Sequence, residues 1–355
     1  MPLWSLITPL AAAALLALSV ALPQAIAPGA VSAIALVGAV IAAVHHAELI
    51  AHRVGEPFGT LVLALAVTVI EVALIVSMML AGGPDKATLP RDTIFSTLMI
   101  ICNGVVGLCL VVGSLRHHEQ VFRSEGANAG LAALIAMATL TLVLPTFTTS
   151  SPGPTYTTPQ LGFAATMSLV LWSLFVFVQT KRHRDYFLPL DPASDADAHA
   201  TPPSSRAAWA SGALLLLALM SVVGLAKVLS PGIEAALAAA GAPKPVLGIA
   251  IAMLVLLPET VAAVRAARNN RLQTSLNLAY GSALASIGLT IPAVAAASVW
   301  LGLPLVLGAE AKDLVLLVLT VVVSSITLAS GRTHVLQGAV HLVIFAAFLF
   351  LALVP

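Results

Sequence analysis

The chain has 355 residues, of which 59% are hydrophobic and 9% are charged, and its formal net charge at pH 7 is +1. Ordinary soluble domains carry about 25% charged residues, so this composition excludes a soluble globular protein and predicts an all-α polytopic membrane protein. The near-zero net charge argues against nucleic-acid binding, which typically needs a strongly basic surface.

Apolar runs of about twenty residues predict eleven transmembrane helices, because a helix of that length crosses the roughly 30 Å hydrocarbon core. Their approximate limits are residues 5–26, 29–50, 59–81, 92–114, 127–148, 160–180, 207–229, 245–264, 273–299, 312–329 and 335–354. A weakly amphipathic piece at residues 231–241 could be a half-helix, which leaves a total of ten or twelve open. The first run has no basic segment before it and is long for a signal peptide, so we expect a membrane helix there.

The basic residues predict how the chain is oriented. With eleven spans, eleven of the sixteen Lys and Arg residues fall on one side of the membrane, and the other side receives Lys86, Arg91, Lys227, Lys244 and Lys312. Lys and Arg are enriched in cytoplasmic loops, so we expect a cytoplasmic N-terminus. Cys102 and Cys109 stand seven residues apart in one apolar run and are expected to pack there without forming a disulfide.

A hydrophilic stretch at residues 181–206, rich in Pro, Ser, Ala and Asp, is predicted to be a flexible cytoplasmic linker. It separates an N-terminal helix at 1–28 and a five-helix repeat at 29–180 from a second five-helix repeat at 207–355. Because five is odd, the two repeats would cross the membrane in opposite directions. Inverted repeats of this kind are typical of secondary transporters, whose ion sites lie near the bilayer midplane.

Each repeat carries an acid in the middle of its second helix, Glu71 in the first and Glu259 in the second. An ionised carboxylate at that depth is costly unless it faces water, a cation or a proton. Burial favours the protonated form and a nearby cation favours the charged form, so such a pair could hold either a cation or protons. This competition is the basis of antiport, although a buried acid can also serve as a structural hydrogen-bonding group.

A hard cation also needs neutral oxygen ligands, and small polar residues near the acids could supply them. The candidates are Asn103, Ser282, Ser286, Thr290, Thr68 and Thr260. Ser282, Ser286 and Thr290 are spaced four residues apart and would share one helix face. Pro258 has no N–H and leaves the carbonyl of Leu254 without its helical partner. Serine and threonine in membrane helices can equally serve helix packing.

A second polar cluster lies at the predicted cytoplasmic end of the second span. His45, Glu48 and His52 would share one helix face, and Glu56 follows in the next loop. Three interpretations stay open: a polar cap on a helix end, a pH-responsive cytoplasmic entrance, and a transition-metal site. The last would make the protein an exporter of Zn²⁺-like ions.

Two segments carry a resemblance to a known family. The first runs from His45 through Gly55-Glu-Pro-Phe-Gly-Thr60 to Glu71, and the second from Leu257-Pro-Glu-Thr260 through Arg268-Asn-Asn-Arg271 to Pro292. They resemble the ChaA-type bacterial calcium/proton antiporters, which also handle sodium and potassium, within the cation/calcium exchanger superfamily. The resemblance implies alpha motifs at about 55–115 and 245–299.

The same resemblance implies roles for single residues. Glu71 and Glu259 would be the paired cation and proton carboxylates, with Asn103 and Ser282 as supporting ligands and Ser286 near the position of a further polar residue. The chain departs from the wider superfamily by having Val-Thr-Val-Ile before Glu71 and a threonine at position 260. Fewer polar ligands favour a site that also accepts sodium or potassium.

The sequence therefore predicts a secondary antiporter of a bacterial inner membrane that exports Ca²⁺, and Na⁺ or K⁺, in exchange for H⁺. Its expected partners are inorganic cations, protons and the lipid bilayer, and no cofactor is expected. An enzyme is disfavoured, because the spans contain no His-Glu-x-x-His pair and no nucleophile beside a base.

Overall fold

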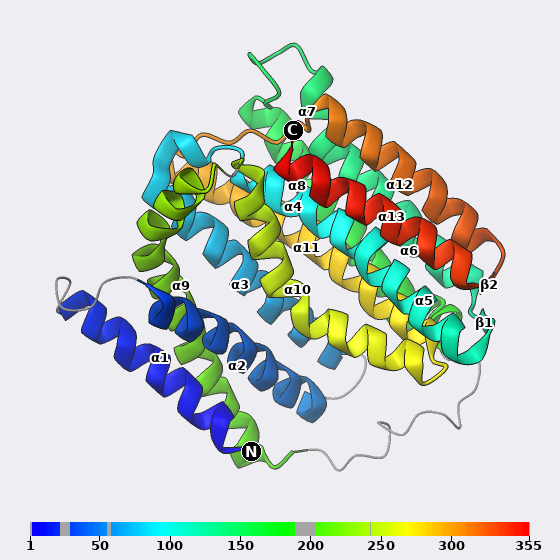
Figure 1. The fold of residues 1–355 in the computed structure, drawn as a ribbon, viewed down its shortest axis with the longest axis horizontal. Coiled ribbons are helices and arrows are strands. Elements are labelled where there is room, and N and C mark those ends of the chain that lie inside the picture. The colour runs from blue at the N-terminus through cyan, green and yellow to red at the C-terminus, as the bar shows by residue number, and fades with distance from the viewer. Residues whose placement is uncertain (1, 22–28, 55–57, 189–202, 242, 355) are drawn as a thin grey trace. The chain divides into compact units, whose positions relative to one another are not determined.

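The structure is a computed structural model that describes all residues except 1, 22–28, 55–57, 189–202, 242 and 355 (Figure 1). Eleven helices in the described part are long and apolar enough to cross a membrane. This confirms the predicted all-α polytopic architecture. The spans begin and end within a few residues of their predicted limits except the seventh, whose helix runs from Ser205 to Ala239 and not to residue 229.

The helices follow one another along the chain. They are α1 (Leu3–Ala21), α2 (Ala30–Val54), α3 (Phe58–Gly82), η1 (Gly83–Lys86), α4 (Leu89–Met99), η2 (Ile100–Val105), α5 (Val106–His117), α6 (Ser124–Ala138), η3 (Thr139–Val143), α7 (Leu144–Phe147), α8 (Thr158–Phe177), η4 (Val178–Arg182), η5 (Arg184–Tyr186), α9 (Ser205–Ala239), α10 (Pro245–Arg268), α11 (Leu272–Leu301), α12 (Ala311–Ala329) and α13 (Val335–Leu353). Two short strands, β1 (Gln120–Val121) and β2 (Arg332–Thr333), pair antiparallel with Gln120 opposite Thr333.

The seventh span is longer than predicted, and the fourth span contains a π-helical segment. The piece at 231–241 starts inside α9, which continues through Pro231 to Ala239, so it is the end of a long helix. The fourth span runs through α4, η2 and α5, and its η2 segment is a π-helix with a wider turn. Segments of π-helix are rare and recur at functional sites.

The described residues divide into two compact units, each drawn from both sides of the linker. One unit comprises Met1–Ala87 and His199–Lys244, and the other comprises Thr88–Ala198 and Pro245–Pro355. In the first unit, α2 packs against α1, α3 and α9. The fully buried His46 joins three of these helices, because its Nε2 lies 2.8 Å from the Ser5 carbonyl oxygen and its Nδ1 lies 3.3 Å from Ser211 Oγ.

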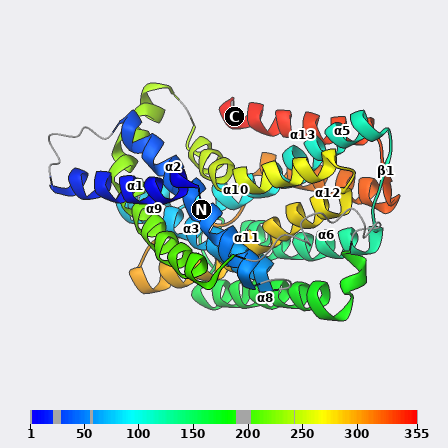
Figure 2. The same cartoon turned by 90° about the horizontal axis from the view of Figure 1, so that it is seen from below.

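In the second unit, α10 and α11 pack against the fourth span, and α13 lies alongside α5 (Figures 1 and 2). Close approach of α10 to α4 depends on Gly248, where an added Cβ would lie 2.8 Å from the Asp92 carbonyl carbon and 2.9 Å from the Thr93 nitrogen. Further along, Glu259 shares a pocket with Ile101 and Val105. The two helices therefore run parallel, as the fourth and eighth of alternating spans must.

Candidate functional site

Glu71 lies near the middle of α3 in the first unit, and its side chain is buried. At about 1.5 Å per residue it stands about 20 Å from Phe58 and about 16 Å from Gly82 along the helix axis. Thr68, one turn earlier on the same helix, is also buried. The carboxyl group is thus held far from either end of an apolar span.

Glu259 lies at a comparable depth in α10, about 21 Å from Pro245 and about 14 Å from Arg268. Its side chain lines a pocket of the second unit that encloses about 180 Å³ including its open mouth. The walls come from η2, α10 and α11, and the lining residues are Ile101, Val105, Leu256, Glu259, Thr260, Ala279 and Ser282. The pocket therefore offers one carboxylate and two hydroxyl groups on an otherwise apolar wall.

The hydroxyl of Thr260 donates a hydrogen bond to the Leu256 carbonyl oxygen of its own helix at 2.7 Å. This use of its proton leaves lone pairs on Oγ1 that can accept from water or bind a cation. Ser282, on α11, contributes the second hydroxyl oxygen. Carboxylate and hydroxyl oxygens are ligands that hard cations such as Ca²⁺ and Na⁺ accept. The prediction that Thr260 and Ser282 lie near Glu259 is therefore met by the geometry.

Other predicted ligands lie elsewhere in the second unit. Ser286 and Thr290 are buried one and two turns beyond Ser282 on α11, and neither is among the described residues that line the Glu259 pocket. Asn103 is fully buried in η2, between Ile101 and Val105 in sequence, yet it too is not among those lining residues. Its amide Nδ2 donates to Thr320 Oγ1 at 2.8 Å, and its Oδ1 lies 3.2 Å from His341 Nδ1.

The partners of Asn103 are residues that the sequence did not single out. His341 is the one histidine within the last span, and Thr320 and Thr327 lie seven residues apart on α12 with Ser324 between them. All four side chains are buried. The three α12 residues are spaced four and three positions apart and therefore lie along one helix face. That periodicity is the signal that could have identified them from the sequence.

The polar cluster on α2 does not gather into a metal site in the part of the chain that the structure describes. The ring of His45 packs against Trp4, with centroids 4.9 Å apart, whereas His52 is exposed. Glu48 is half-buried, and Glu56 lies outside the described residues. Among the described side chains, no three His, Cys, Asp or Glu residues come close enough to hold a metal ion. The transition-metal alternative thus gains no support here.

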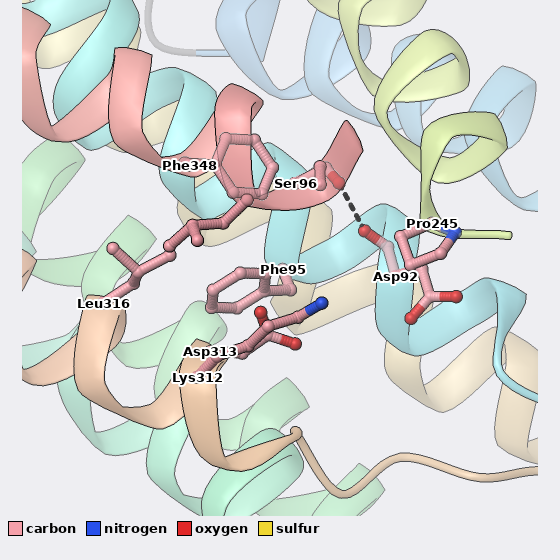
Figure 3. A pocket seen from close by; sticks show the side chains of 10 residues that line it. Asp92, Phe95, Ser96, Pro245, Lys312, Asp313, Leu316 and Phe348 are labelled. Carbon is pink, nitrogen blue, oxygen red and sulfur yellow. Dashed lines mark hydrogen bonds between the residues drawn. The ribbon is translucent and has the colours of Figure 1, made fainter. Parts of the chain in front are cut away.

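A second pocket of the same unit, shown in Figure 3, lies where α4, α12 and α13 meet the first residue of α10. Its wall includes Asp92 and Asp313. The Asp92 carboxylate is 2.8 Å from Arg91 Nε and accepts a hydrogen bond from Thr88 at 3.0 Å. This buried carboxylate is thus already neutralised by an arginine, which disfavours cation binding at Asp92.

A family model for sodium/calcium exchanger proteins matches residues 24–181 and 210–354 of the chain. The chain belongs to this family. The finding confirms the resemblance to the cation/calcium exchanger superfamily that the two quoted segments carry.

Two relatives extend along nearly the whole of this exchanger. The Sinorhizobium fredii protein named "Putative ionic transporter y4hA" is 51% identical over 358 residues, covering 100% of this chain and 97% of its own length. The sodium-potassium/proton antiporter ChaA of Escherichia coli is 35% identical over 350 residues, covering 97% of this chain and 94% of its own. Among solved structures, the H⁺/Ca²⁺ exchanger CAX has a TM-score of 0.72 and 15% identity, covering 98% of this chain and 88% of that one. The last likeness concerns the fold alone.

Proposed function

We propose that this exchanger is a cation/proton antiporter of a bacterial inner membrane, and that Glu71 and Glu259 carry the exchange. The observation that supports the proposal most is the Glu259 pocket, which combines a carboxylate with the hydroxyls of Thr260 and Ser282 in the middle of an apolar span. The involvement of Glu71 rests on its equivalent place in the first sequence repeat and on its burial within α3.

The exchange follows from the energetics of a carboxylate in a membrane. A charged carboxylate without a counter-ion is costly in this environment, so each glutamate is stable either with a cation or with a proton. A carrier that changes sides only in these two states moves cations one way and protons the other. In alternating access, the protein would load a cation from the cytoplasm, release it outside and return protonated.

The pocket chemistry bears on which cation is carried. One carboxylate and two hydroxyl oxygens give fewer ligands than the six to eight that Ca²⁺ usually takes, so water would have to complete the shell. Monovalent cations need less negative charge in their site than Ca²⁺ does. ChaA is named for sodium and potassium and CAX for calcium, and we propose that this exchanger transports Ca²⁺ together with Na⁺ or K⁺.

The proposal is tested with inverted membrane vesicles whose interior is acidified and reported by a quenched pH dye. Calcium, sodium, potassium, magnesium and zinc are added in turn to vesicles that contain the wild-type protein. We expect dequenching with calcium and with sodium or potassium, and none in vesicles without the protein. A triple variant, His45→Ala with Glu48→Gln and His52→Ala, should keep this response. A response to zinc alone that the triple variant lost would overturn the proposal in favour of a transition-metal exporter.

A further inference from the structure

A chain of four buried hydrogen bonds crosses the second unit beside the Glu259 pocket. Thr327 Oγ1 lies 3.1 Å from His341 Nε2, His341 Nδ1 lies 3.2 Å from Asn103 Oδ1, and Asn103 Nδ2 donates to Thr320 Oγ1 at 2.8 Å. Thr320 in turn donates to the sulfur of Met99 at 3.5 Å. The four polar side chains are at most 3% exposed.

The chemistry of the groups fixes the direction of every bond in this chain. A carboxamide oxygen can only accept, so His341 Nδ1 must carry a proton and donate to Asn103. Nε2 of the neutral ring is then the acceptor for the Thr327 hydroxyl. The Asn103 amide also donates to the Met99 sulfur at 3.8 Å, so Asn103 and Thr320 share this acceptor. Hydrogen-bonded chains of this kind strengthen each other in a low-dielectric interior. The side-chain amide of Asn103 is therefore held between His341 and Thr320, an arrangement that we call the Asn103 clamp.

Two glycines bring His341 within reach of Asn103. An added Cβ at Gly107 of α5 would lie 2.9 Å from the Cβ of His341, and one at Gly338 of α13 would lie 2.8 Å from the Gly107 carbonyl oxygen. Only residues without a side chain allow the two helices this separation, which is the way small residues act at membrane helix interfaces. The close contact between α5 and α13, which brings His341 to Asn103, thus requires glycine at both positions.

Asn103 lies in the same helical segment as two residues of the Glu259 pocket wall. Asn103 lies in the π-helical segment η2, and Ile101 and Val105 of the same segment line the pocket. Each residue in an α-helix turns the chain by about 100°. Relaxation of η2 to an α-helix would therefore rotate either Asn103 or the pocket-lining residues of η2 away from their present neighbours. Either the asparagine would leave His341 and Thr320, or the wall of the pocket would change.

We propose that His341 is a positioning residue that, through Asn103, holds the π-helical wall of the Glu259 pocket and thereby sets the affinity for the transported cation. This inference rests on the proposed function, since it assigns the pocket to cation binding. His341 itself does not line the pocket among the described residues, so it acts through the segment it clamps.

The experiment measures proton flux against cation concentration in inverted vesicles for four full-length proteins. His341→Leu removes both hydrogen bonds of the ring, and we expect its apparent KM for the cation to rise about fivefold or more with little change in maximal rate. His341→Asn keeps a donor near the Nδ1 position and should return the KM to within about twofold of wild type. Ser325→Ala, on the exposed face of α12, leaves all four hydrogen bonds of the chain in place and should resemble wild type.

A merely structural role would lower the amount of folded protein and the maximal rate, and would leave KM unchanged in every variant. That result, or a His341→Asn protein as impaired as His341→Leu, overturns the inference. If His341→Leu does not fold, Thr320→Val tests the other end of the clamp, and an unchanged KM there overturns the inference as well. Absence of cation-dependent flux in the wild type would instead reject the proposed function.

Discussion

Ser282 lines the Glu259 pocket with a neutral oxygen, and its hydroxyl can complete the shell of a bound cation without adding charge. We expect Ser282→Ala to raise the apparent KM for the cation about three- to tenfold, the effect of losing roughly one polar contact, and to leave the maximal rate nearly unchanged. The measurement is dye dequenching against cation concentration.

Ser325→Ala is the matched control for Ser282→Ala. Ser325 also lies within a membrane span, but its hydroxyl donates to the Val321 carbonyl oxygen on an exposed helix face. Equal KM values for the Ser282→Ala protein and the wild type would remove Ser282 from the cation site.

At the scale of single residues, the sequence singled out two acids that the structure places within apolar spans, and it identified only some of their neighbours. An acid within an apolar span needs a cation, a proton or water to offset the cost of its charge, so Glu259 could be proposed as a site residue without a structure. Asn103 shows the limit of prediction from sequence. The sequence indicates on which face of its own helix a residue lies, but it does not indicate which neighbouring helix that face contacts. The π-helix at η2 also shifts the faces away from α-helical spacing. His341 carried no pattern of its own.

Among the helices, the contact between α5 and α13 makes a specific demand on Gly338. An added Cβ there would lie 2.7 Å from the Val111 nitrogen and 2.8 Å from the Gly107 carbonyl oxygen, and neither backbone atom can move away easily. We expect Gly338→Ala to destabilise the protein by about 1–3 kcal/mol, the usual cost of overpacking. The measurement is thermal unfolding in detergent.

Gly162→Ala, on α8, provides the control for Gly338→Ala, because an added Cβ there meets nothing within 4 Å. Alanine favours helix by about 1 kcal/mol over glycine, so this variant should unfold at the wild-type temperature or above. A Gly338→Ala protein as stable as the Gly162→Ala protein would contradict the close approach of the two helices.

Arg91 pairs with Asp92 at the start of α4 and also contacts the segment before α12. Arg91 is 2.8 Å from the Asp92 carboxylate and donates to the Gly308 carbonyl oxygen and to Glu310, both at 3.3 Å. Arg91→Met would leave the Asp92 carboxylate buried without its counter-charge, at a cost of about 3–5 kcal/mol. We expect a large fall in the thermal unfolding temperature, and partial recovery when Asp92→Asn is added.

Lys312→Met tests whether burial is the reason for the large effect at Arg91. The Lys312 ammonium is 3.7 Å from Glu310, and both side chains are considerably more exposed than the Arg91 pair. Exposed pairs contribute little, so this variant should unfold close to the wild-type temperature. If Arg91→Met and Lys312→Met lower the unfolding temperature equally, the account of the buried pair is wrong.

The helices themselves could be predicted almost completely, because twenty apolar residues between polar or Pro/Gly positions allow few alternatives. Pro231 was the one ambiguous point. A proline usually ends a helix, yet α9 continues through it, and membrane helices tolerate such a residue when neighbouring groups satisfy the freed carbonyl.

For the whole molecule, the distribution of basic residues predicts a cytoplasmic N-terminus, and labelling of single cysteines can test it. The native Cys102 and Cys109 are buried, so the background reaction with a membrane-impermeant maleimide should be low. We expect Asp85→Cys to react in intact cells and Arg332→Cys to react only after permeabilisation, since the positive-inside rule puts them on opposite sides. Both side chains are exposed. The reverse pattern would invert the predicted orientation.

The grouping of helices into compact units is a whole-molecule property that the repeat pattern of the sequence does not encode. The repeats divide the chain at the linker, whereas packing joins α9 to α1, α2 and α3. Sequence similarity between repeats reports common ancestry and local pattern. Contacts between helices depend on faces that are distant in sequence, and these are visible only in the folded chain.

The central claim is that two membrane carboxylates carry the exchange of cations for protons. The most direct test compares cation-driven dequenching in inverted vesicles for wild type, Glu71→Gln, Glu259→Gln and the control Glu119→Gln, whose exposed carboxylate faces Arg332 at 3.5 Å. We predict that Glu71→Gln and Glu259→Gln each abolish the response to every cation, because glutamine can neither release a proton nor neutralise a cation. Glu119→Gln should respond like wild type. Substantial exchange in either Glu71→Gln or Glu259→Gln, at normal expression, would contradict the account.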